Sequence, residues 1–287
     1  MLAIFSREVK SFFITMTGWV FVAFMLVFIG IYMMIYNLNY GYGNFEYVLS
    51  GLTFVYLMAV PLLTMRCFAD ERRQHTDQLL YALPLSSGKI VMGKYLAMLV
   101  VLAVPTVVSC TYPVIISLFG DVYLPTAYAS ILAFFLLGAA LTAVGMFCSS
   151  LCESQVTAAV VCFIVLLVDY FISGLSSLVP SGVGPACFVV SVLIALGVVA
   201  LIVLTKNGVF AVAVGVVAEV ALLAVAAFNG SVLEGAVPDV LSGISLFERF
   251  SPFVEGVFDL ASIAFFLAVT AAFAVLTVHC FEKRRWS

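Results

Sequence analysis

The chain has 287 residues, of which 65% are hydrophobic and 9% are charged. A soluble globular domain carries roughly 45–50% apolar and about 25% charged residues, so this chain has too few charges to cover a surface in water. Disordered chains are poor in apolar residues, and nucleic-acid-binding domains carry a basic face, whereas the net charge here is −3. The composition therefore predicts an integral membrane protein that does not bind nucleic acid.

Long apolar runs divide the chain into segments that can cross a lipid bilayer. A helix needs roughly 20 apolar residues to cross the hydrocarbon core, and the runs are continuous rather than alternating, which favours helices over a β-barrel. The predicted fold class is an all-α membrane protein with about eight transmembrane helices in a single domain over residues 1–287. The expected spans are Thr15–Tyr36, Val48–Phe68, Ile90–Phe119, Ala127–Leu151, Val156–Leu178, Pro185–Thr205, Val209–Phe228 and Leu260–Phe281.

The distribution of lysine and arginine orients these spans. With a cytoplasmic N-terminus and C-terminus, all 12 basic residues except Arg249 fall on the cytoplasmic side. Cytoplasmic loops of membrane proteins carry an excess of basic residues, so this orientation is favoured over its reverse.

The N-terminal segment 1–11 has the pattern of an amphipathic helix that lies along the inner membrane surface. Leu2, Phe5 and Val9 share one helical face, and Arg7 and Lys10 are placed to meet lipid headgroups.

The segment richest in charge, Asp70–Pro84, lies between the second and third spans. Four charged residues open it, and three leucines that share one helical face follow. A proline then ends the pattern. A short amphipathic helix of this kind suits docking into a groove on a soluble partner as well as it suits lying on lipid. The candidate residues are Asp70, Glu71, Arg72, Arg73, Thr76, Leu79, Leu80, Leu83 and Pro84.

This region resembles the type-2 class of ABC exporter permeases, and within it the gliding-motility-associated branch. Members of that branch carry a loop of the form FAEERRxGTxExLLxxLPxSxxxIVxGK, and this chain reads FADERRQHTDQLLYALPLSSGKIVMGK from Phe68 to Lys94. The last span and its basic-Trp tail are also similar. His75 and Gln78 depart from the Gly and Glu usual at those positions. The basic form of the family has six spans, so residues 185–228 look like an inserted helix pair.

The resemblance implies a permease subunit of an ATP-driven exporter in the inner membrane of a prokaryote, moving a hydrophobic or amphipathic substrate. Two permease subunits, as a homodimer or heterodimer, would sit on two copies of a separate ATPase subunit. ATP and Mg²⁺ would bind to that partner, and this chain would hold no cofactor and no metal. Asp70–Pro84 would be the coupling helix, and an accessory extracytoplasmic subunit is compatible with the family.

The residues themselves carry no signature of catalysis. Gly88–Tyr95 approximates a phosphate-binding loop, but Tyr95 stands where Ser or Thr must contact magnesium. Two other function classes stay open. One is a secondary transporter driven by an ion gradient, which would have two similar halves. The other is an envelope-acting ABC component that does mechanical work without transport.

Two acids, Asp169 and Glu219, fall well inside predicted spans. An unpaired charge facing lipid at the bilayer centre costs roughly 2.5–3.5 kcal/mol, so each must face a protein or aqueous interior or be protonated. Either acid is a candidate polar contact in a transport pathway. The alternative for each is a structural hydrogen bond to a neighbouring helix.

The extracytoplasmic loop, residues 229–259, contains apolar residues at helical spacing with Pro252 as an interruption. This pattern predicts an amphipathic helix or a broken helical hairpin in the outer interface. In the resembled family, short helices here cover the exit of the pathway. The predicted apolar stripe is Val240, Ile244, Phe247, Phe250, Val254 and Val257.

Overall fold

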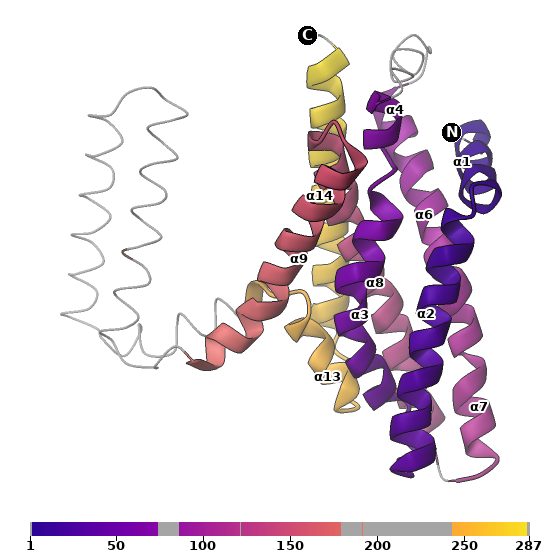
Figure 1. Cartoon of the computed structure of the whole chain (residues 1–287). Helices are drawn as coiled ribbons and strands as arrows, with labels where there is room; N and C mark the ends of the chain where they lie inside the picture. Colours follow the sequence, from indigo (N-terminus) through magenta and orange to yellow (C-terminus); the bar gives the residue numbers. More distant parts are fainter. Residues whose placement is uncertain (1, 74–85, 121, 179–190, 192–242, 286–287) are drawn as a thin grey trace. The chain divides into compact units, whose positions relative to one another are not determined.

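A computed structural model describes residues 2–73, 86–120, 122–178, 191 and 243–285 of the chain. Every regular element among these residues is a helix (Figure 1). Six helical segments of the described part are long and apolar enough to cross a membrane: Thr17–Asn39, Glu46–Arg73, Ser87–Ser117, Leu124–Leu151, Gln155–Ile172 and Leu260–Lys283. These correspond to the first five predicted spans and the last one.

The sixth and seventh predicted spans, within residues 185–228, lie outside the described residues apart from Ser191. The count of eight spans and the inserted pair therefore stay predictions. The chain divides into two compact units, Met1–Val168 with Arg249–Ser287, and Asp169–Glu248. Nearly all of the described helices belong to the first unit, and the single-domain assignment stays a prediction.

The centre of the first unit is α8, Leu124–Leu151, which packs against α3, Glu46–Thr64, α6, Ser87–Ser109, and α14, Leu260–Arg285. Two glycines of α8 let α3 approach closely. A Cβ at Gly138 would lie 2.7 Å from the Tyr56 hydroxyl, and one at Gly145 would lie 2.5 Å from Thr64 Oγ1. Since these glycines are two turns apart, they form one small-residue face, a common device for packing membrane helices.

The N-terminal helix α1, Leu2–Ile14, extends three residues beyond its predicted end. It packs against α6 through the buried side chains of Ile4 and Phe12, whereas Phe5 and Val9 are only half-buried. The protein-facing side of α1 is therefore not centred on the predicted apolar face. Met16 has a φ of 60°, and this left-handed residue turns the chain from α1 into α2, Thr17–Met33.

The first span ends in a π-helix, η1, Met34–Asn39, that continues α2 beyond the predicted end of the span at Tyr36. The wider turn shows in the bond from the Tyr40 N–H to the Ile35 carbonyl, 3.1 Å. The Asn37 amide donates to the carbonyl of Tyr42 at 2.6 Å and fixes the loop that leads into α3. Turns of this kind are rare in helices and are frequent at functional sites.

The third predicted span is interrupted. Helix α6 ends at Ser109 and α7, Thr111–Ser117, follows after Cys110. The break has a local cause, because Pro113 lacks the N–H that would bond to the Ser109 carbonyl in a continuous helix.

The loop before α14 contains two short helices, η3, Glu248–Phe250, and α13, Ser251–Val254. This agrees with the predicted broken helical structure, but the predicted stripe does not coincide with the buried residues. Ile244 and Val257 of the stripe are 58% and 56% exposed, and Phe253, which the stripe omits, is 1% exposed. The short 3-10 turn places Phe250 and Phe253 on the same side, so a regular α-helical spacing selects the wrong residue.

Candidate functional site

Four charged side chains form a closed ring where α1, α4 and α6 meet. Helix α4, Ala69–Arg73, is the first turn of the predicted coupling segment. Lys94 Nζ lies 2.8 Å from Glu71 Oε1 and 3.4 Å from Glu8 Oε1. Arg7 Nη2 lies 2.8 Å from Glu8 Oε1 and 3.3 Å from Glu71 Oε1. Each cation therefore contacts both carboxylates, and the formal charges of the four residues cancel.

Lys94 is the buried member of this ring, with a side chain only 2% exposed. Its ammonium group also donates to the Cys67 carbonyl at 2.9 Å and lies 5.2 Å from the centroid of the Phe68 ring. A buried ammonium is tolerated only with such partners, because leaving water is costly for an isolated charge. Lys94 thus fixes the end of α3 and the start of α4 to α6.

Arg7 is the exposed member, with 57% of its side chain accessible. The hydrogen bond to Glu8 raises the pKa of the Arg7 guanidinium above its ordinary value, so Arg7 stays charged at every physiological pH. The sequence placed Arg7 among lipid headgroups. In the structure its guanidinium closes the ion ring and remains largely exposed, so the contact with headgroups stays a prediction.

The backbone and side chains of α4 are also tied to the junction of α8 and α9, Gln155–Leu178. The Ser149 hydroxyl accepts hydrogen bonds from the N–H groups of Phe68 and Ala69 at 3.2 and 3.3 Å. Two further bonds reach the same junction: Arg72 donates to the Cys152 carbonyl at 2.8 Å, and the Gln155 amide donates to the Asp70 carboxylate. Helix α4 is therefore connected to α1, α6, α8 and α9.

Of the predicted coupling residues, the structure brings Asp70, Glu71 and Arg72 into these contacts and leaves Arg73 exposed. The remaining ones lie outside the described residues: Thr76, Leu79, Leu80, Leu83 and Pro84.

Sequence reasoning missed Glu8 and Lys94 as partners in the ring. A signal for Lys94 was present, because an ionisable residue two turns inside an apolar span needs a partner. The acids that Lys94 contacts come from the N-terminal segment and from the loop before the span.

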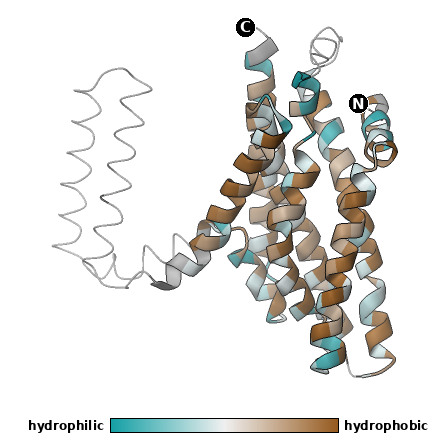
Figure 2. Ribbon diagram, viewed as in Figure 1, coloured by the Kyte–Doolittle hydropathy of each residue, from teal (hydrophilic) through white to brown (hydrophobic). Residues whose placement is uncertain are grey.

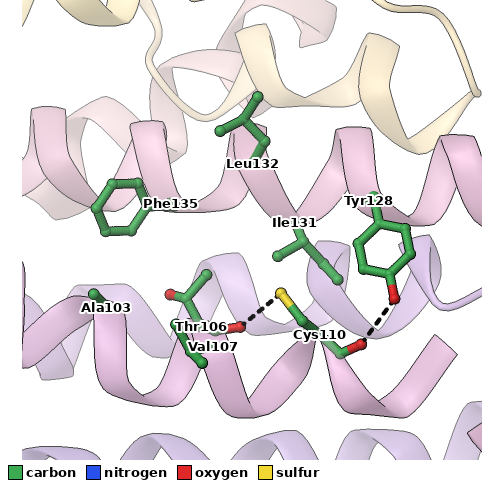
Figure 3. A pocket seen from close by; sticks show the side chains of 8 residues that line it. All are labelled: Ala103, Thr106, Val107, Cys110, Tyr128, Ile131, Leu132 and Phe135. Atoms are coloured by element: carbon green, nitrogen blue, oxygen red, sulfur yellow. Dashed lines mark hydrogen bonds between the residues drawn. The ribbon is translucent and has the colours of Figure 1, made fainter. Parts of the chain in front are cut away.

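An apolar groove of about 300 Å³ lies between α6 and α8, far along both helices from the ion ring (Figure 3). Its polar groups are already bonded within the chain. The Tyr128 hydroxyl donates to the Cys110 carbonyl at 3.2 Å, the Cys110 thiol contacts the Thr106 carbonyl at 3.4 Å, and the Thr106 hydroxyl donates to the Leu102 carbonyl at 3.0 Å. The groove therefore offers only apolar contact. Its lining residues are Ala103, Thr106, Val107, Cys110, Tyr128, Ile131, Leu132 and Phe135.

The predicted pathway acid Asp169 has structural partners within the second unit. The N–H of Leu246 lies 3.2 Å from both carboxylate oxygens, and the Ser245 hydroxyl donates to the Asp169 carbonyl at 3.2 Å. These bonds connect residues 245–246 to α9. Among the described residues, the hydrogen-bond donor to the Asp169 carboxylate is a backbone N–H and not a side chain of another span. Glu219 lies outside the described residues.

The helices are mostly apolar along their lengths, and hydrophilic residues lie on α1 and α4 and at the opposite helix ends (Figure 2). Six apolar spans among the described residues, with hydrophilic ends, indicate a multi-pass membrane protein. A family model described as ABC-2 family transporter protein matches residues 11–182, which include the first five spans and the whole segment Asp70–Pro84. The chain belongs to this family. A search of curated proteins finds no match.

Family membership makes the chain a permease subunit, the membrane component of an ABC transporter, and not itself the catalytic component. It also implies association with an ABC ATPase and with a membrane. The gliding-motility branch is narrower than the matched family and stays a prediction.

Proposed function

We propose that the segment Asp70–Pro84 is the coupling helix of an ABC exporter and that a separate ATPase subunit binds its leucine face. The observation that supports this is the attachment of α4 to four other helices by ion pairs and hydrogen bonds. A displacement of the segment would be passed on to those helices, because helices and packed interfaces move as rigid bodies.

The remaining features of the proposal follow from sequence and composition. The distribution of basic residues supports a cytoplasmic location for α1, α4 and both termini. The resemblance to exporter permeases supports the inner membrane of a prokaryote as the location of the chain. The permease pairs with a second permease subunit, identical or different, on two ATPase copies that bind ATP and Mg²⁺. The apolar interior and the groove between α6 and α8 support a hydrophobic or amphipathic substrate, moved outward.

The test of docking is co-purification with the ATPase encoded beside this chain. We expect the double variant Leu79→Glu, Leu80→Glu to lose the ATPase, because two carboxylates cannot enter an apolar groove on the partner. The matched control is Leu118→Glu, Phe119→Glu, which changes two adjacent apolar residues that are 77% and 87% exposed at the far end of α7. Retention of the ATPase by the first variant would overturn the docking proposal.

Transmission is tested separately with Glu71→Gln. This change keeps the shape of the side chain but removes one carboxylate from the ring. We expect the ATPase to remain bound while substrate-dependent ATP hydrolysis falls. Unchanged coupling in this variant would show that the ring is structural only.

A secondary transporter would behave differently. It would move substrate without the ATPase in response to an imposed ion gradient, and reconstitution of the chain alone in vesicles separates the two cases.

A further inference from the structure

The end of the α2–α3 hairpin opposite the ion ring carries a continuous row of tyrosines. The ring centroids of successive members are 6.1, 6.3, 6.1 and 5.8 Å apart, within the range of interacting aromatic pairs. The last three are 67%, 53% and 42% exposed, so their faces are accessible. The tyrosine row is Tyr32, Tyr36, Tyr40, Tyr42 and Tyr47.

Two buried acceptor oxygens accompany this row. Glu46, in the first turn of α3, is 4% exposed, and its Oε2 has no hydrogen-bond partner among the described residues. Asn37, in the π-helix η1, is 9% exposed, and its Oδ1 likewise has no partner within the described part of the chain. Buried polar atoms are bonded in the great majority of cases, so two such atoms in one hairpin call for an explanation.

The loop connects the two acceptors to the tyrosine row. Asn37 donates a hydrogen bond through its amide nitrogen to the carbonyl of Tyr42. Its amide oxygen has no hydrogen-bond partner among the described residues. The ring of Tyr42 contacts that of Tyr47, the neighbour of Glu46 in the chain. Helices η1 and α3 are themselves in contact. The π-helix thus brings the acceptors and the aromatic faces to one end of the hairpin.

The chemistry of these groups favours a ligand with positive charge. Both atoms are acceptors, one of them on a carboxylate, so they bind either a hydrogen-bond donor or a metal cation. Tyrosine faces attract cations. A primary ammonium group with an apolar body satisfies both conditions, whereas an anion or a neutral acceptor satisfies neither.

A belt of tyrosines is common where membrane helices meet water. Such a belt accounts for the exposed rings but not for two buried acceptors without partners or for a π-helix. We infer that the hairpin end formed by η1, the loop 40–45 and the start of α3 binds the ammonium group of an organic amine, with Glu46 and Asn37 as acceptors. The inference does not depend on the coupling proposal.

The experiment is calorimetric titration of the purified full chain in nanodiscs of phosphatidylglycerol with benzylammonium chloride. Benzyl alcohol serves as the neutral ligand of similar shape. We expect saturable binding of benzylammonium alone, and binding weakened by about tenfold or more in Glu46→Gln, because a charge-assisted hydrogen bond is lost. Asn37→Leu should weaken binding as well.

The matched control is Glu255→Gln, which neutralises an exposed acid and should leave binding unchanged. A second series of nanodiscs with phosphatidylethanolamine identifies the source of the ammonium group. Competition by this lipid assigns the site to a headgroup, and its absence assigns the site to a free amine.

Three outcomes would overturn the inference: equal binding of benzyl alcohol by the wild-type chain, undiminished binding in a correctly folded Glu46→Gln protein, or binding of Na⁺ or Ca²⁺ but not of benzylammonium. The comparison of the two ligands uses the wild-type protein, so it holds even if a variant fails to fold.

Discussion

Lys94 and Glu71 form an ion pair of 2.8 Å in which the lysine side chain is only 2% exposed, and this pair joins the third span to the first turn of the loop that precedes it. Glu8 and Arg7 complete the ring from the N-terminal helix. These contacts attach the start of the segment proposed for coupling to α1 and α6.

Replacing Lys94 by methionine should strongly destabilise the protein. The change leaves the carboxylates of Glu8 and Glu71 without the buried one of their two shared cations, and breaking a buried ion pair costs about 3–5 kcal/mol. Thermal unfolding in detergent measures the loss. The control Lys89→Met removes an exposed lysine from the start of the same helix and should have little effect. An equal decrease in thermal stability in both variants would contradict a stabilising role for the ion ring.

Replacing Arg7 by glutamine should cost far less. Its side chain is 57% exposed, and ion pairs in contact with solvent contribute about 0–1 kcal/mol. The same melting assay at low and high salt checks this, since the small contribution should shrink further as salt rises. A loss as large as that of Lys94→Met would show that Arg7 is buried in the assembled transporter.

Ser149→Ala should destabilise the start of α4. Its hydroxyl accepts from two backbone N–H groups, and a buried donor left without an acceptor costs about 1–3 kcal/mol. Ser150→Ala is the matched control, because that hydroxyl bonds only to the Phe147 carbonyl of its own helix. Faster proteolysis of the loop 70–84 in the first variant alone is the expected readout, and similar rates in both would refute it.

Gly145→Ala should loosen the contact between α3 and α8. The added methyl would lie 2.5 Å from Thr64 Oγ1, and overpacking of this kind costs about 1–3 kcal/mol. Gly30→Ala is the comparison, because a Cβ at Gly30 has nothing within 4 Å. The melting temperature should fall for the first variant only, and a neutral result there would mean that the two helices separate easily.

The Asp259 carboxylate stabilises the first turn of α14 in a pH-dependent way. Its carboxylate accepts from the Ser262 hydroxyl at 2.6 Å and from the N–H groups of Ala261 and Ser262. The bond from the Ser262 hydroxyl is the largest of the causes that lower the pKa of Asp259. A lowered pKa means that this stabilisation is present above the unfolded value of about 3.9 and is lost as pH falls through the lower folded value.

The stability of the variant Asp259→Asn should therefore not show this decrease at acid pH. At neutral pH the free energies of unfolding of the two proteins should differ only by a constant amount. Acid titration of stability, followed by circular dichroism, compares them. Parallel titration curves over the whole range would show that Asp259 does not cap the helix.

The sequence predicted the described spans well because each is a continuous apolar run that ends at a polar or helix-breaking residue. The start of the last span at Leu260, for instance, follows the capping residue Asp259. The π-helix after Met33 could not be predicted, because no residue pattern distinguishes a wide turn from a regular one inside an apolar run. The break at Cys110 had a signal in Pro113, which lacks the backbone N–H of a continuous helix.

The site was predicted only in part. Glu71 was identified from a motif, but its partners Lys94 and Arg7 lie 23 and 64 residues away in sequence. Such pairing depends on how α1 packs against α6, and the periodicity of a single helix does not contain that information. The burial of Ile4 and Phe12 in α1 could not be predicted for the same reason, since it depends on the helices against which α1 packs.

The ion ring has a consequence for the order of events during synthesis. Helix α1 is synthesised before the third span, yet Lys94, the partner of its Glu8 carboxylate, belongs to that span. Helix α1 therefore cannot reach its final position until the later span has entered the bilayer. Until then Glu8 and Arg7 remain in water, so this early element is fixed only after a later one.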